Sequence, residues 1–140
     1  MIYLVPVGRF LYSAIFLMTV LGHFSAAYIG YAAQQGVPAA GLLVPLSGVI
    51  AILGGLSITL GYKAKIGGWL IVLFLVPVTL KMHNFWAVTD PMMHGMQIAM
   101  FMKNVSMVGS ALLIAYFGSG PVSLDARRGG QPAGASAMRG

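Results

Sequence analysis

Lys103 is the only charged residue in a long apolar segment that contains MFMKNVSMVG at positions 100–109. A lysine at the centre of a membrane span costs at least about 2.5 kcal/mol on insertion scales. The sequence contains only two acidic residues, Asp90 and Asp125, and both lie outside the apolar segments. Three explanations are open. The amine loses its proton, it hydrogen-bonds to carbonyls and polar side chains of the chain, or a bound anion or a second protein supplies the negative charge.

The three histidines form a second group that could do chemistry. We expect His23, His83 and His94 to lie in one layer near one membrane surface, which also contains Tyr28, Asn84, Trp86 and Gln97. Imidazole and amide groups can hydrogen-bond the carbonyl oxygens of a quinone head group. Ordinary interfacial histidines, and haem b or another metal, are the alternatives. Because three histidines on three elements lack the spacing of a local metal motif, no metal site is predicted.

Helical geometry relates some of these residues to one another. His94 and Gln97 are three residues apart and share a face, and Asn104 lies seven residues beyond Gln97 on nearly the same line. Lys103 points about 120° away from Gln97, so one common pocket is not required. No catalytic residue is predicted. The candidate ligand- or partner-binding residues are Lys103, Asn104, Gln97, His94, His83, Asn84 and His23.

The composition shows what kind of fold must position these side chains. Of the 140 residues, 59% are hydrophobic and only 7% are charged, against about a quarter charged in soluble domains. The chain is therefore an integral membrane protein with room for one domain. It has no cysteine, which excludes disulfides, thiolate nucleophiles and c-type haem attachment. The net charge of +6 is too dispersed to bind nucleic acid.

Four apolar segments are long enough to cross a bilayer, which takes about 20 residues in a helix. The predicted fold is an all-α membrane bundle of four helices. Ser47, Ala51, Gly55 and Thr59 recur at intervals of four, so another helix can approach the second span closely there. Residues 121–140 are small, polar and basic, and a disordered cytoplasmic tail is predicted for them. The predicted spans are about 8–30, 41–61, 66–82 and 95–117.

Lysine and arginine positions predict the orientation. Basic residues gather in the turn at 62–65 and in the tail from Arg127, which four spans place on one side of the membrane. Both termini are therefore predicted to be cytoplasmic, in a multi-pass protein of the cell (inner) membrane. Lys81, at the opposite end of the third span, is the exception. The first span is expected to be retained, because no basic region precedes its apolar core.

Four further segments carry a family resemblance. They are LGGLSITLGY at 53–62, HNFW at 83–86, FMKNVSMVGSALL at 101–113 and GSGPVSLDARR at 118–128. In this order they resemble the DoxX family of small four-span membrane proteins. The resemblance covers nearly the whole chain to Arg128.

The DoxX resemblance implies roles for particular residues. Lys103 and Asn104 would be the family's Lys-Asn pair, and residues 83–86 its histidine and aromatic segment. Some members are subunits of thiosulfate:quinone oxidoreductase, and others associate with redox-detoxifying proteins. Many members carry a glutamate just ahead of the glycine pair in the second span, where this chain has IAI at 50–52. If that glutamate faces the lysine, its absence leaves Lys103 free for another anion.

These observations predict an integral membrane subunit associated with a quinone-linked oxidoreductase complex. A non-covalently bound quinone is the candidate cofactor, and whether the chain has enzymatic activity is left open. One alternative is a small oligomeric transporter in which Lys103 attracts an anion. Another is a structural membrane module in which Lys103 pairs with a carboxylate of another subunit. The predicted partners are the lipid bilayer and a second protein or a further copy of the chain.

Overall fold

A computed structural model describes residues 1–129, and every regular element in that range is a helix. Four helical segments are long and apolar enough to cross a membrane: Leu4–Phe24, Ala40–Leu60, Ala64–Ala87 and Pro91–Phe117. The prediction of an all-α membrane bundle is confirmed. The α-helices are α1 (Leu4–Thr19), α2 (Ala26–Gln34), α3 (Ala40–Leu60), α4 (Ala64–Met82), α5 (Pro91–Phe117) and α6 (Leu124–Arg128), and the 3-10 helices are η1 (Val20–Phe24) and η2 (Phe85–Ala87).

Capping residues explain where two helices depart from the predicted bounds. The segment predicted as one span at 8–30 breaks at Ser25, whose extended backbone and side chain cap α2 by accepting a hydrogen bond from Tyr28 N. Asp90 caps α5 in the same way, accepting from Met93 N at 2.8 Å. Pro91 then occupies the first helical position, which its fixed backbone angle suits. As a result α5 starts four residues earlier than predicted.

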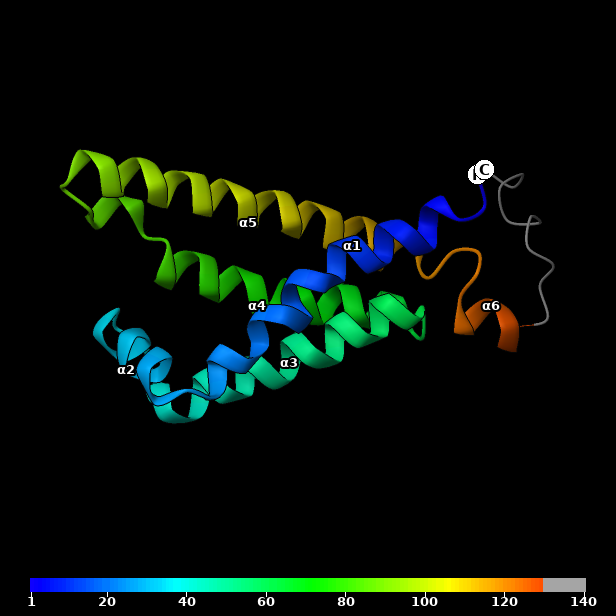
Figure 1. The fold of residues 1–140 in the computed structure, drawn as a ribbon, viewed down its shortest axis with the longest axis horizontal. Coiled ribbons are helices and arrows are strands. Elements are labelled where there is room, and N and C mark those ends of the chain that lie inside the picture. Colours follow the sequence, from blue (N-terminus) through cyan, green and yellow to red (C-terminus); the bar gives the residue numbers. More distant parts are fainter. Residues whose placement is uncertain (130–140) are drawn as a thin grey trace.

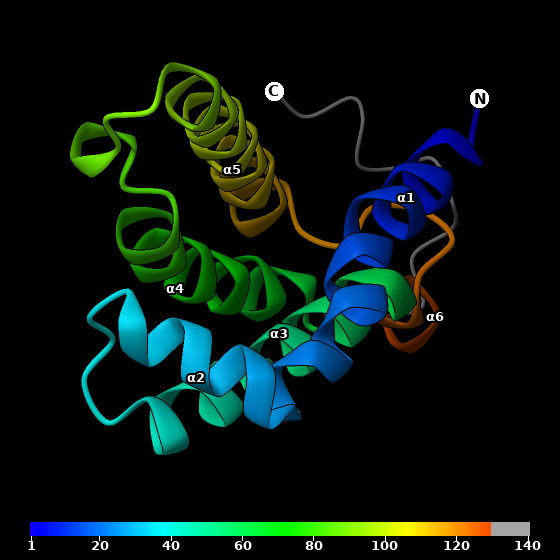
Figure 2. The same ribbon diagram turned by 60° about the vertical axis from the view of Figure 1, so that its left-hand side comes forward.

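The spanning helices form a curved row rather than a closed ring. Helix α5 packs on α4, α4 on α3, and α3 on α1, while α2 lies over α3 (Figures 1 and 2). Helices α1 and α5 therefore stand at the two ends of the row. They meet where Tyr12 Oη donates to Met107 O at 2.8 Å, and they diverge from there toward the end of the bundle that carries α2 and η2. We call that end the loop end, and the opposite end, with the N-terminus and α6, the terminal end.

Small residues let neighbouring helices approach closely. Gly55, in the predicted stripe on α3, lies against Leu17 of α1, and Thr59 hydrogen-bonds Ser13. Between α4 and α5, a Cβ on Gly68 would lie 2.7 Å from the backbone oxygen of Ala111. Only glycine fits at residue 68, so this contact fixes how α5 sits on α4.

A cluster of polar groups closes the terminal end, and we call it the Arg9 cluster. It comprises Arg9, Gly61, Ser119, Val122 and Asp125. The Arg9 side chain is only 5% exposed; its guanidinium donates to the carbonyl oxygens of Ser119 and, at 2.7 Å, Val122. Gly61 adopts φ +63° beside the guanidinium, a conformation and a close approach that favour glycine.

Asp125 ties the chain after α5 back to the turn between α3 and α4. Its carboxylate accepts from Ser119 Oγ at 2.5 Å and from Lys63 N at 2.9 Å, and its backbone N donates to Gly61 O. The Ser119 hydrogen bond holds the pKa of Asp125 below its usual value. Residues 121–129 are thus ordered, contrary to the disorder predicted from residue 121, because the chain itself satisfies their polar groups. The rest of that predicted tail lies outside the described residues.

Candidate functional site

The predicted site residues fall into three places rather than one. The first lies at the loop end between α4 and α5, the second lies between η1 and α2, and the third is the middle of α5.

Most of the predicted histidine layer forms a loop cluster made by His83, Asn84, Phe85, His94 and Gln97. His83 Nδ1 and Gln97 Oε1 are 2.8 Å apart, and His94 Nδ1 lies 3.2 Å from the carbonyl oxygen of Val88. The Phe85 ring packs edge-on against His94, and Asn84 stands at the start of η2. Each imidazole already has a polar neighbour in the chain. Within residues 1–129, no three His, Asp or Glu side chains come together as a metal ion would require.

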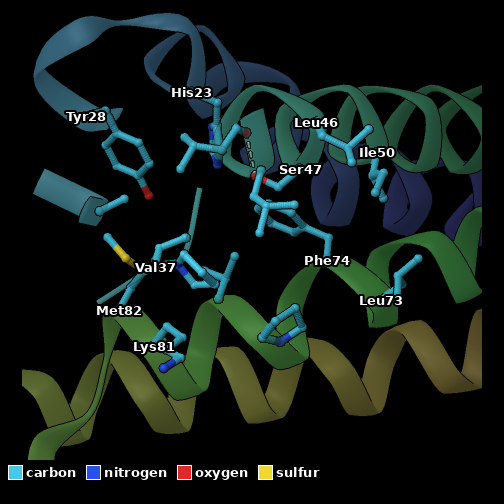
Figure 3. Close-up of a pocket in the computed structure, with 16 residues that line it drawn as sticks. His23, Tyr28, Val37, Leu46, Ser47, Ile50, Leu73, Phe74, Lys81 and Met82 are labelled. Carbon is cyan, nitrogen blue, oxygen red and sulfur yellow. Dashed lines mark hydrogen bonds between the residues drawn. The ribbon is translucent and has the colours of Figure 1, made fainter. Parts of the chain in front are cut away.

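His23 lies apart from the loop cluster, on η1. It is 6% exposed and its ring stacks at an angle on Tyr28 and Phe74, with centroids 5.0 and 5.6 Å away. Its Nδ1 atom is buried and has no hydrogen-bond partner among the residues the structure describes. Figure 3 shows His23 and Tyr28 on one wall of a cavity, with Lys81 and Met82 across from them. The cavity has a volume of about 420 Å³.

Lys103 occupies the middle of α5. Twelve residues separate it from Pro91 and fourteen from Phe117, so it lies about 18 and 21 Å from the two ends of the helix. Its side chain is exposed on the bundle, and its one hydrogen-bonding contact is a weak one to Met100 Sδ at 3.5 Å. The neighbouring Asn104 is buried instead, at 5% exposure. Adjacent residues of the predicted Lys-Asn pair therefore face different environments.

No acid of this chain lies level with Lys103. Asp90 caps the start of α5 and Asp125 belongs to the Arg9 cluster, and the sequence has no other Asp or Glu. Helix α5 is also the least covered span: 17% of its most apolar stretch is buried, against 39% for the third span. The ammonium group is thus set on an open helix face at mid-membrane depth.

Two basic residues with clear structural surroundings were not among the sequence-based candidates. Arg9 stands near the start of the first predicted span, and nothing in the sequence relates it to residues 119–125. Lys81 lines the cavity beside Met82. Lys81 was the one exception to the lysine and arginine distribution that predicted the orientation. That exception was the signal in the sequence that could have identified Lys81 as a candidate.

Comparison with known proteins places the chain among other membrane proteins. The family model described as "SURF4 family" matches residues 41–129, which run from α3 to α6. Escherichia coli (strain K12) inner membrane protein YqjF is 30% identical over 124 residues, covering 86% of this chain and 88% of the relative. Inner membrane protein YphA of the same organism is 29% identical over 99 residues, covering 71% and 70%. No solved structure matches.

A eukaryotic protein is similar over a shorter region. ER-derived vesicles protein ERV29 of Saccharomyces cerevisiae is 26% identical over 80 residues. These residues are 57% of this chain but only 26% of the relative.

The resemblance to DoxX is wrong, because the family model that matches is a different one. All four segments that suggested it fall inside residues 41–129. Their structural roles include close helix packing, as at Gly54 and Gly55, and the turns and caps that lead into α6. Any compact bundle of short spans needs such features, so they do not distinguish one family from another.

Proposed function

The chain belongs to the SURF4 family and is a multi-pass inner membrane protein, and we propose that it binds a second membrane protein through the open face of α5. In this proposal Lys103 pairs with an Asp or Glu in a transmembrane helix of that partner. The observation that carries the proposal is the exposed ammonium group in the middle of α5, whose only polar contact among residues 1–129 is a thioether.

The surroundings of Lys103 do not offset the cost of placing its charge in lipid. A lysine at the centre of a span costs at least about 2.5 kcal/mol, and a contact to sulfur is too weak to offset that. With a hydrocarbon core about 30 Å thick, the middle of α5 is far from either surface. A carboxylate from a partner helix would satisfy the ammonium group and be satisfied by it, because a charge-assisted hydrogen bond is about twice as strong as a neutral one.

Residues around Lys103 would let another helix come close. Ala99 lies one turn before Lys103 and Ser106 about one turn after, and both are exposed on the same face. A Cβ on Gly95 or Gly109 would meet nothing within 4 Å. Small side chains beside a polar one are typical of helix contacts in membranes.

A second copy of the chain cannot supply this carboxylate from its spans, because none of the four described spans contains an acid. The transporter alternative meets a related difficulty. Because Lys103 faces out of the bundle, an anion pathway along it would run between chains rather than through one.

The hypothesis of a quinone-linked oxidoreductase subunit has lost its family support, because the DoxX resemblance is wrong. The layer of histidine and amide side chains is what remains in its favour. The chain's polar groups at the loop cluster bond mainly to one another, and a head group would have to displace those contacts.

A relocated lysine tests the proposal. The tagged full-length chain is recovered from its native membranes in mild detergent as wild type, Lys103→Arg, Lys103→Met, and the double variant Lys103→Met with Met102→Lys. The double variant keeps the composition and the depth of the charge but turns it by about 100° around α5. Wild type and Lys103→Arg are expected to retain the same membrane protein, and the other two to lose it at least about tenfold, or 1.4 kcal/mol.

The identity of the retained protein completes the test. It must carry an Asp or Glu within a transmembrane span, and changing that acid to its amide must reduce recovery as much as Lys103→Met does. Equal recovery with Lys103→Met, or a retained protein with no acid in its spans, would contradict the proposal.

A further inference from the structure

The cavity at the loop end is separate from the face of α5 that carries Lys103. Its lining comes from η1, α2, the chain before α3, and helices α3 and α4, and no residue of α5 contributes. At about 420 Å³, it is toward the lower end of the range of about 300–1,000 Å³ that small-molecule sites occupy. It therefore has room for one apolar chain rather than for a two-chain lipid.

The cavity is apolar along most of its length and is reached from the side. Leu46 on α3 and Leu73 on α4 line it and are themselves 48% and 59% exposed. Both lie on membrane spans, where the exposed surface meets hydrocarbon. An apolar chain can thus enter from the bilayer without crossing water.

One wall of the cavity carries a hydrogen-bond donor. Tyr28 stands beside the buried His23 imidazole, with its hydroxyl directed into the cavity (Figure 3). Burial raises the pKa of the Tyr28 phenol, so it stays protonated and able to donate. The third polar residue there, Ser47, already donates to Val44 O at 2.7 Å.

The position of His23 is built into the packing. A Cβ on Gly48 of α3 would lie 2.8 Å from His23 Cβ, so only glycine lets η1 approach α3 this closely. Gly48 thus fixes His23 at the side of the cavity, with its ring against Tyr28 and Phe74.

Charge selects the kind of ligand. Lys81, in the last turn of α4, also lines the cavity, and none of the lining residues is acidic. A cation and a phenol donor with no carboxylate favour an acceptor that carries negative charge.

We infer that this cavity binds a single-chain anionic amphiphile, whose carboxylate or phosphate head group meets Lys81 and the Tyr28 hydroxyl. Its apolar chain lies along Leu46, Ile50 and Leu73 toward the bilayer. The shared chemistry is one anionic head group on one chain, and a free fatty acid or a lysolipid could supply it.

Photolabelling of the full chain in nanodiscs of phosphatidylcholine tests the inference. The probe is a photoreactive analogue of palmitic acid, and adducts are mapped by mass spectrometry. The competitors are palmitic acid, lysophosphatidic acid, palmitic acid methyl ester and a neutral short-chain quinone. Adducts are expected on α2, α3 and α4 around the cavity, and the two anions are expected to compete at least about tenfold better than the two neutral compounds. The ratio between palmitate and lysophosphatidic acid then shows which head group the site prefers.

Two conservative variants sharpen the result. Lys81→Gln should lower labelling about tenfold, whereas Lys65→Gln, at the terminal end, should leave it unchanged. Tyr28→Phe removes only a hydroxyl and should lower labelling roughly threefold to fivefold. Equal labelling of the two lysine variants would overturn the inference. So would a methyl ester or quinone that competes as well as palmitate, since either would mean that any apolar chain fills the cavity.

Discussion

Arg9 and Lys103 both lie within membrane-spanning segments, and the chain surrounds these two cations in opposite ways. Arg9 of α1 is 5% exposed and donates to two backbone carbonyl oxygens, with the Asp125 carboxylate held in the same cluster. Lys103 of α5 is exposed and touches a thioether. Asp125, one of the two acids, lies in the Arg9 cluster at the terminal end, and neither acid lies beside Lys103.

The difference separates a structural charge from a binding charge. Arg9 joins the start of α1 to the chain that follows α5, so its contacts close the terminal end of the row of helices. The Lys103 side chain makes no hydrogen bond to another helix among the described residues. Among the described residues, the Arg9 guanidinium donates to two backbone carbonyl oxygens, although its Nε is buried without a partner. A buried cation with such acceptors stabilises the fold, whereas a cation left without an acceptor costs stability unless something else supplies one.

The largest expected effect comes from removing Arg9. In Arg9→Met, the carbonyl oxygens of Ser119 and Val122 lose their donor, and we expect the free energy of unfolding to fall by ~2–4 kcal/mol. Arg9→Lys keeps the charge but cannot present two donors in the guanidinium's fixed geometry, so an intermediate loss is expected. Thermal unfolding of the purified protein in detergent measures both. If Arg9→Met unfolds like the wild type, the Arg9 cluster is not the structural element described here.

The second-largest loss of stability is expected from a substitution at Gly68. A Cβ there would lie within 2.8 Å of the α5 backbone at Ala111 and Ala115; backbone cannot yield as a flexible side chain does. Gly68→Val is therefore expected to cost ~1–3 kcal/mol by forcing α4 and α5 apart. Gly109→Ala on α5 is the control, because its Cβ meets nothing within 4 Å. Similar melting temperatures for the two variants would show that α5 is held by something other than this contact.

A smaller effect should follow from acidification. Because the folded state lowers the pKa of Asp125, its stabilising contribution is present above the unfolded value of about 3.9 and is lost as the pH falls through the folded value. Asp125→Asn should cost about 1 kcal/mol near neutral pH, and this difference from wild type should shrink on going below pH ~4. Melting temperatures of both proteins between about pH 3 and 7 provide the test. A difference that is constant over that range would mean that the carboxylate charge is not involved.

The smallest effect on stability is expected at Lys103. Lys103→Met should change the free energy of unfolding in detergent by less than about 0.5 kcal/mol, or raise it, because the side chain makes no strong contact. The same purified samples used for Arg9→Met serve for this measurement. A loss as large as that of Arg9→Met would remove the contrast between the two cations.

The sequence predicted the helical membrane bundle, the number of its spans and the position of Lys103 inside the last span. These features follow directly from composition and from the lengths of the apolar segments. It could not predict the Arg9 cluster, because Arg9, Gly61 and Asp125 are far apart in the chain and meet only through the packing of α1, α3 and α6. It also placed His23 with His83 and His94 from depth alone. The break at Ser25 and the close contact at Gly48 instead bring His23 to α3 and α4, where the cavity lies.

The role of Lys103 can be tested most directly by crosslinking from its own helix face. A photoreactive amino acid replaces Ala99, one turn from Lys103 on the same face, and in a second protein replaces Val105, which is exposed about 200° away. In native membranes, position 99 is predicted to crosslink to a transmembrane segment that contains an Asp or Glu, and this adduct should be absent from position 105 and from the Lys103→Met background. An adduct that survives Lys103→Met, a crosslinked segment without an acid, or lipid adducts alone at position 99 would contradict the account.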